Sequence, residues 1–279
     1  MQNLDFFAKE HFDLFKFVTF SLILAVSSAL QFRVPHQNTL ARTMKNWRVN
    51  LPLALIYTIL FGMICGSCVC LFASQIKHFG SGVFDLIHLS YGWQIVLSIV
   101  LLDLVAYFFH RLYHESRFFW RFHAVHHSDV VYDASTALRF HPAELLFSLV
   151  VRLAIIGAFG VPLLGLFLFE GVFILFNLVE HSDIRFPEKV EQIVSRVFVT
   201  PSMHRRHHSV ELHDLNSNFG TIFAIWDYLF KTINIRKSQE VIPVGAPEVM
   251  ETFLHPLDLL ILPFSDPKKQ RKKMKRTQS

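Results

Sequence analysis

Long apolar segments alternate with polar ones along the first two thirds of the chain. They cover residues 17–32, residues 51–74, which contain no charged residue, and residues 88–109. A helix needs about 20 apolar residues to cross a bilayer, so each segment is predicted to be a transmembrane helix, the first with help from its flanks. The alternative for the first segment is a cleaved signal peptide, but no clear cleavage site follows its small residues.

A fourth apolar segment, residues 143–179, is too long for one span. Gly160 and Pro162 interrupt it, and glycine and proline are typical of helix ends. We therefore predict a hairpin of two helices that enter and leave the membrane on the same side. Arg152 and Glu170 are equidistant from the interruption, so an antiparallel hairpin places them at one depth, where a lone charge is expensive and a pair is tolerated.

Basic residues are distributed unequally between the predicted loops. Four Lys or Arg residues lie within residues 33–48, whereas Lys77 alone lies between the second and third spans. Short cytoplasmic loops are enriched in Lys and Arg, which predicts that the first loop is cytoplasmic and the N-terminus lies on the opposite side. Residues 110–144, residues 181–235 and the basic C-terminus then all fall on the cytoplasmic side.

These patterns predict an all-α integral membrane protein with about three transmembrane helices plus a helical hairpin. A cytoplasmic helical cap would hold the polar, histidine-rich regions. We divide the chain into an N-terminal transmembrane region (1–109), a histidine-rich catalytic cap that includes the hairpin (110–235), and a C-terminal segment with a basic tail (236–279).

The composition supports a membrane location. With 52% hydrophobic residues, 18% charged residues and a mean hydropathy of +0.37, the 279-residue chain is too apolar for an ordinary soluble domain. The formal net charge of +5 comes mainly from residues 268–276, so we expect no nucleic-acid partner. Cys65, Cys68 and Cys70 lie within one apolar segment, which excludes a secreted disulfide scaffold.

The 16 histidines are the unusual feature of this composition, because eight of them form three short clusters. Residues three and four apart share a face of a helix, so each cluster aims two or three imidazoles at one point. Neutral imidazole suits Zn, Fe, Cu or Ni, and eight ligands exceed the roughly four that one zinc ion uses, which favours two metal ions. A pH-sensing cluster would not need this spacing. The clusters are His110 and His114; His123, His126 and His127; and His204, His207 and His208.

The spacing of these clusters and of the residues around them resembles the fatty acid hydroxylase/sterol desaturase superfamily. The matching motifs cover about residues 103–232. His114 and His123 are close in sequence, whereas acyl-chain desaturases usually separate their first two histidine clusters widely, so the hydroxylase branch is favoured. Besides the three clusters, the motifs comprise Asp103, Tyr107, Trp120, Asn177, His181, Asn218 to Gly220, Trp226, Asp227, Phe230 and Thr232.

The resemblance implies a non-haem di-iron oxygenase that uses O₂ and two electrons to hydroxylate or desaturate a lipid C–H bond. Two iron ions would be held by the eight clustered histidines and His181, with zinc as a substitute in purified protein. Asn177 stands where some family members have a further histidine, which leaves a tenth ligand open. His141 lies in a similar family motif and His213 close to the last cluster, and we expect both to support the cap rather than bind metal.

Acidic residues near the clusters are candidates to hold the ligand rings in place. Asp103 lies seven residues before His110 and is expected on the same helix face at membrane depth. Asp227 and the amide Asn177 are the other two candidates. Three further acids adjoin the clusters: Glu180, Asp183 and Asp214. Helix capping is the alternative role for these acids. Three arginines are expected to bind no metal and either to contact lipid head groups or an acidic electron donor, or only to mark the cytoplasmic side: Arg111, Arg205 and Arg206.

The partners follow from these expectations. A cap seated on membrane helices can take a lipid from the bilayer through an apolar slot, for which Phe108, Phe109, Phe118, Phe119 and Phe122 are candidates. No nucleotide-binding or haem-binding motif occurs, so a separate electron-transfer protein is expected. Hydroxylation and desaturation of a lipid both remain open. A membrane metal-binding or transport protein is a remote alternative, and a zinc hydrolase is disfavoured because HExxH is absent.

Overall fold

A computed structural model describes residues 2–57, 69, 71–75, 82–235, 240–246 and 255–265. These residues form helices, loops and isolated bridges, and none of them lies in a β-strand. The elements are α1 (Gln2–Arg33), α2 (Leu40–Tyr57), α4 (Val83–Leu86), α5 (Tyr91–Glu115), α6 (Arg117–His127), η2 (Ala134–Leu138), α7 (Pro142–Phe159), α8 (Leu163–Glu180), α9 (Glu188–Val194), α10 (Pro201–His207), α11 (Leu212–Leu215), α12 (Ile225–Leu229), α13 (Pro256–Ile261) and η3 (Leu262–Phe264).

Within the described residues, four helices are long and apolar enough to cross a membrane: Leu4–Arg33, Tyr91–Glu115, Pro142–Phe159 and Leu163–Glu180. The first is far longer than the predicted 17–32, because the helix continues through a mixed polar segment at its N-terminal end. The third predicted span begins later and runs past residue 109 into the first histidine cluster. Half of the predicted span 51–74 lies outside the described residues, and its first part, residues 51–57, forms the end of α2.

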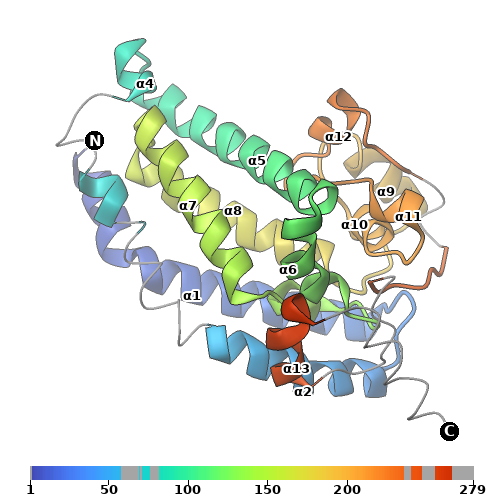
Figure 1. Ribbon diagram of the computed structural model, residues 1–279. Coiled ribbons are helices and arrows are strands. Elements are labelled where there is room, and N and C mark those ends of the chain that lie inside the picture. Colours follow the sequence, from blue (N-terminus) through green and yellow to red (C-terminus); the bar gives the residue numbers. More distant parts are fainter. Residues whose placement is uncertain are drawn as a thin grey trace, which may run out of the picture.

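The helical hairpin is confirmed. Helix α7 ends at Gly160, whose φ of 68° is the left-handed conformation that glycine adopts without strain. Pro162 then precedes the first turn of α8. Helix α8 packs between α1 and α5, whereas α7 packs against α5 and α6 (Figure 1). Their interior is apolar, and Ile156, Leu166 and Phe169 are almost completely buried in it.

The predicted pairing of Arg152 with Glu170 is also confirmed, and the structure adds a third charge. Arg152 donates a hydrogen bond from Nη1 to Glu170 Oε1, and Lys16 Nζ of α1 lies 3.0 Å from Glu170 Oε2. The glutamate side chain is only 5% exposed. Charges at membrane depth are tolerated when paired, so this triad fastens α1 to the hairpin.

A cap of short helices covers one end of the long ones. Helices α9, α10, α11 and α12 gather beside the C-terminal ends of α5 and α8, with α6 beside them (Figure 1). Buried polar contacts join α2 to this cap: the Asp129 carboxylate accepts hydrogen bonds from Asn46, Asn50 and Thr136. The loop after α1 also reaches the cap, because Pro35 forms a bridge with Ile184. The division predicted between residues 109 and 110 falls inside α5 and stays a prediction.

Replacing Glu170 with glutamine should destabilise the protein, because Lys16 and Arg152 would lose their shared anion. Removing one member of a buried ion pair costs about 3 kcal/mol or more, which denaturation in micelles can measure. The triple variant Lys16→Met, Arg152→Met, Glu170→Gln leaves no unpaired charge and should be more stable than Glu170→Gln alone. A triple variant less stable than the single one would contradict this role of the triad.

Candidate metal centre

Nine of the 16 histidines meet in two groups at the junction of the long helices and the cap. In each group, one ring nitrogen from every histidine lies within 4.8 Å of those from all the others. No other such group of histidine, cysteine or acidic residues occurs in the described residues. The first histidine group contains His110, His114, His123, His127 and His207, and the second contains His126, His181, His204 and His208.

Helix periodicity decides which histidine joins which group. His110 and His114 are four residues apart on α5 and both enter the first group, as do His123 and His127 on α6. His126 leaves α6 in another direction and joins the second group. We expected each cluster to aim at one point, and this is wrong for the second and third clusters. The histidines of these two clusters are divided between the two groups, because on these helices only side chains four residues apart point to the same group.

Hydrogen bonds to backbone carbonyls orient three of these rings from outside. His110 donates from Nδ1 to Phe219 O at 2.9 Å, His207 to Ser217 O at 2.7 Å, and His181 to Asn177 O at 2.7 Å. A carbonyl oxygen can only accept, so Nδ1 carries the proton in each neutral ring. The Nε2 atom of each ring is then a bare lone pair directed into the group.

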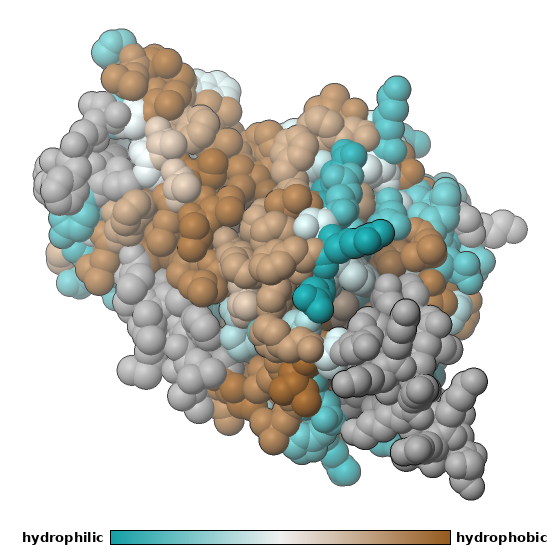
Figure 2. Space-filling view, in the orientation of Figure 1, coloured by the Kyte–Doolittle hydropathy of each residue, from teal (hydrophilic) through white to brown (hydrophobic). Residues whose placement is uncertain are grey.

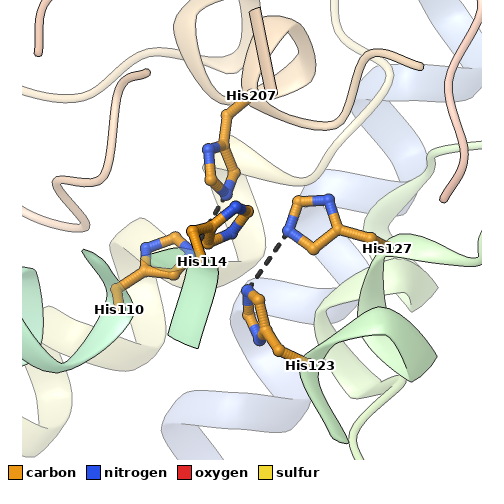
Figure 3. A group of neighbouring side chains, drawn as sticks. All are labelled: His110, His114, His123, His127 and His207. Carbon is orange, nitrogen blue, oxygen red and sulfur yellow. Dashed lines mark hydrogen bonds between the residues drawn. The ribbon is translucent and has the colours of Figure 1, made fainter. Parts of the chain in front are cut away.

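These lone pairs face one another. His207 Nε2 lies 3.0 Å from His110 Nε2 (Figure 3), although neither atom carries a proton to donate. Two such lone pairs repel unless a cation lies next to both. Nitrogens bound to one metal ion at about 2.1 Å lie about 3.0–3.4 Å apart, so the spacing fits ligands of a common ion.

Unsatisfied ring nitrogens support the same conclusion. Neither nitrogen of His114 or His208 has a hydrogen-bond partner, and Nδ1 of His126, His127 and His204 also lacks one. Buried polar atoms are rarely left unpaired in proteins. If one nitrogen of each ring binds a metal ion, fewer buried nitrogens are left without a partner. The residues present therefore fit a metal ion in each group.

Burial keeps the cap histidines neutral. Desolvation lowers the pKa of His123 and of His181 to about 3. The pKa of each of the other cap histidines is well below its usual value, first because of burial and then because neighbouring histidines repel a second charge: His126, His127, His204, His207 and His208. A neutral imidazole has the free lone pair that metal binding requires.

The three residues that we expected to support the ligands act less directly. Asp103 contacts no histidine; its carboxylate accepts hydrogen bonds from Ile222 N, Phe223 N and the Trp226 indole. It therefore positions the loop that follows the third cluster. Asp227 holds Phe219 N and Gly220 N, and the Phe219 carbonyl is the group that orients His110. Asn177 orients His181 through its backbone carbonyl, and not through its side chain.

One acidic residue that binds a histidine directly was not predicted from the sequence. Glu144 Oε1 lies 2.7 Å from His123 Nδ1, and both side chains are buried. Glu180 Oε1 lies 3.9 Å from His181 Nδ1, and Glu180 Oε2 lies 3.8 Å from His204 Nδ1. The available signal for Glu144 was a single acid in the first turn of an otherwise apolar helix, three residues after His141.

The remaining polar residues have structural positions. His141 accepts a hydrogen bond from Ala143 N and donates one to Leu260 O, while the His213 side chain is 79% exposed. Neither joins a histidine group. The expected surface role is wrong for two arginines: Arg205 is buried against the Tyr132 ring, and Arg206 is buried and paired with Asp214. Arg111 is partly exposed and pairs with Glu115.

A cavity of about 140 Å³ adjoins both histidine groups. Its polar side includes Glu144, Glu180 and Asn177, and its other walls come from α5, α7 and α8. Of the five phenylalanines proposed for a lipid slot, Phe109 lines this cavity and the other four do not. The histidines on its wall are His110, His123, His126, His181 and His204, and the apolar residues are Leu102, Val105, Ala106, Phe109, Phe140, Val151 and Phe173.

Fold and site together define a multi-pass membrane protein with a histidine-rich metal site next to a largely apolar cavity. Comparison with known proteins identifies the family. The model of the fatty acid hydroxylase family matches residues 95–232, which contain all nine histidines of the two groups. The chain belongs to the fatty acid hydroxylase superfamily through this segment.

Curated relatives support the assignment. The chain is 34% identical over 144 residues to an ornithine lipid hydroxylase of Rhizobium tropici, covering 51% of this chain and 42% of that protein. It is 32% identical over 151 residues to an alkylglycerol monooxygenase of Caenorhabditis elegans, covering 53% of this chain and 28% of that one. A very-long-chain aldehyde decarbonylase of Oryza sativa is 28% identical over 139 residues, covering 50% and 52%. No solved structure matches significantly.

Changing Glu144 to glutamine should weaken metal binding, because the carboxylate both orients His123 and raises the basicity of its ring. Loss of such a partner typically costs about 10–100-fold in metal affinity. Equilibrium dialysis against zinc with the purified protein measures this. Glu115→Gln, on the exposed last turn of α5, is the matched control and should bind zinc like the unchanged protein. Equal affinities in both variants would contradict the role of Glu144.

Proposed function

We propose that the protein is a membrane-bound non-haem di-iron oxygenase that hydroxylates a lipid C–H bond with O₂. The convergence of nine neutral imidazoles, seven of them buried and two half-buried, on two points beside a largely apolar cavity carries this proposal. Five histidines would hold one iron ion and four the other. Iron bound there would supply the redox chemistry that activates O₂ towards an unactivated C–H bond.

The donor set favours iron in this setting. All nine residues offer neutral nitrogen and no thiolate, a set that suits Fe and Zn. The group of five ligands exceeds the four that a closed tetrahedral zinc site needs. Several curated relatives are named as a hydroxylase or as monooxygenases, beside an aldehyde decarbonylase, which favours an oxidative role over zinc hydrolysis or metal transport.

The protein's own residues would position the substrate. The cavity wall contributed by Val105, Ala106 and Val151 suits a hydrocarbon chain, and histidines of both groups lie on the same cavity. Burial excludes bulk water from the site, because the seven candidate ligands that follow α5 are at most 3% exposed. A lipid chain in this cavity would place its C–H bonds beside the metal ligands.

The arrangement of the helices supports a cytoplasmic cap. The loop after α1 contacts the cap at Ile184 and Asp183, so the basic residues that follow Arg33 lie on the same side as the histidines. Basic loops favour the cytoplasm, which puts the N-terminus of α1 on the opposite side. Electrons for the reaction would come from a separate electron-transfer protein, because the sequence carries no motif for a redox cofactor.

Purified protein loaded under anaerobic conditions should contain about two iron ions per chain. His207→Ala removes a ligand of the first group and His126→Ala one of the second, and each should abolish turnover and lower iron content while membrane insertion is unchanged. Iron analysis and fractionation of membranes measure both effects. A folded sample that takes up no iron would refute the proposal.

Lipid analysis of cells that produce the unchanged chain or the His207→Ala variant should identify the reaction. We expect a lipid that gains one oxygen atom in the presence of the active chain only. A lipid that instead loses two hydrogen atoms would identify the alternative, desaturation at the same site. Identical lipid profiles in the two cell lines would count against both reactions.

A further inference from the structure

A contiguous apolar surface lies at the boundary between the long helices and the cap. It is formed by the first half of α6 (residues 117–121), the segment 48–56 of α2, and α13 with η3; we name it the interfacial ledge. Helix α13 packs against α2, and η3 packs against α6. Five large apolar side chains of the ledge are more than half exposed: Leu55 (60%), Phe118 (55%), Leu257 (59%), Ile261 (61%) and Phe264 (70%).

Helix α13 is apolar on two faces. One face buries Pro256 and Leu259, the latter against Val49, Leu53 and Val125 in a small core. The opposite face presents Leu257 and Ile261, and nothing in the described residues covers them. A helix of six residues is too short to be stable alone in water. A further apolar contact on the outer face would therefore stabilise it.

The ledge lies where the apolar and polar surfaces of the protein meet. Figure 2 shows hydrophobic surface over α5 and α7 and hydrophilic surface over the cap beside α9, α11 and α12. A second hydrophobic area covers α13 and continues towards α2. Because the apolar surface of α5 and α7 belongs to membrane-spanning helices, the ledge is at the depth of the lipid head groups.

The charges of the ledge suit an anionic surface. Arg48, Arg117 and Arg121 are exposed, against one acidic side chain, Asp258. Arg48 also lines a groove of about 490 Å³ between α2 and α13, together with Val49, Pro52 and Leu257. A largely apolar groove that includes one exposed guanidinium matches the two parts of a phospholipid, an acyl chain and a phosphate group.

We propose that the interfacial ledge binds the bilayer surface as a membrane contact separate from the spanning helices, and that its groove holds an anionic phospholipid. Leu257, Ile261, Phe264 and Phe118 enter the acyl boundary, while the three arginines contact phosphates. Phe264 lies 5.9 Å from Phe122 and 6.0 Å from His141, measured between ring centroids. The contact therefore holds the corner between α6 and α7 against the membrane, close to Phe140 and His123 of the cavity wall.

Spin labels at Leu257→Cys and Ile261→Cys test the position of the ledge without any need for turnover. The three native cysteines are replaced by serine, and the protein is reconstituted in nanodiscs of phosphatidylcholine and phosphatidylglycerol. Both labels should collide more often with oxygen than with a water-soluble nickel chelate. Leu212→Cys, on α11 of the cap and 64% exposed, is the control and should show the reverse. Labels on the ledge that are as accessible to nickel as Leu212→Cys would overturn the proposal.

Native mass spectrometry tests the lipid. The unchanged protein should retain phosphatidylglycerol in preference to phosphatidylcholine of the same chain length. Arg48→Gln with Arg121→Gln should lower this preference at least fivefold, since one arginine near a membrane surface contributes about 1 kcal/mol. Lys189→Gln with Arg196→Gln removes two exposed charges elsewhere in the cap and should change nothing. An unaltered preference in the first pair would overturn the anionic lipid site.

Discussion

Nine imidazole rings converge on two small volumes. They can remain together only if a positive charge lies between their lone pairs. The His110 and His207 rings make this plain, because backbone carbonyls take the proton of each Nδ1 and leave two bare Nε2 atoms 3.0 Å apart. Burial excludes the simplest remedy, protonation, by lowering the pKa of the cap histidines. A metal ion in each group resolves the conflict, and the surrounding structure is arranged to keep the rings in this position.

Much of the fold serves that arrangement. Helix α5 carries two histidines out of the membrane, α6 turns back beside it with three more, and the end of the hairpin adds His181. Polar contacts outside the histidine groups keep these elements in place. Asp103 and Asp227 hold the loop between Phe219 and Trp226, and the Phe219 carbonyl orients His110. The charge triad on Glu170 fixes α1 to the hairpin at membrane depth. The cavity lies between these elements because α5, α7 and α8 meet at the histidines.

The membrane determines how lipid and site meet. The long helices place the cavity within reach of the bilayer, and the cap keeps the polar ligands out of the bilayer. The interfacial ledge adds a surface at the depth of the lipid head groups. Relatives that match only about half of this chain act on different lipids by name, and α1, α2 and α13 lie outside the segment 95–232 that the family model matches.

The sequence alone determined the membrane helices and eight candidate ligands, because hydropathy and i, i+3, i+4 spacing are local properties of a helix. The ninth ligand, His181, and the class of protein followed from the resemblance to the family. The sequence also determined the hairpin and the pairing of Arg152 with Glu170, since both follow from one turn between two helices. It could not assign His126 and His127 to different groups, because that depends on how α6 is rotated against α8 and α10. Glu144, Lys16 and the burial of Arg205 likewise depend on contacts between segments far apart in the chain, and only the packing of the helices decides these.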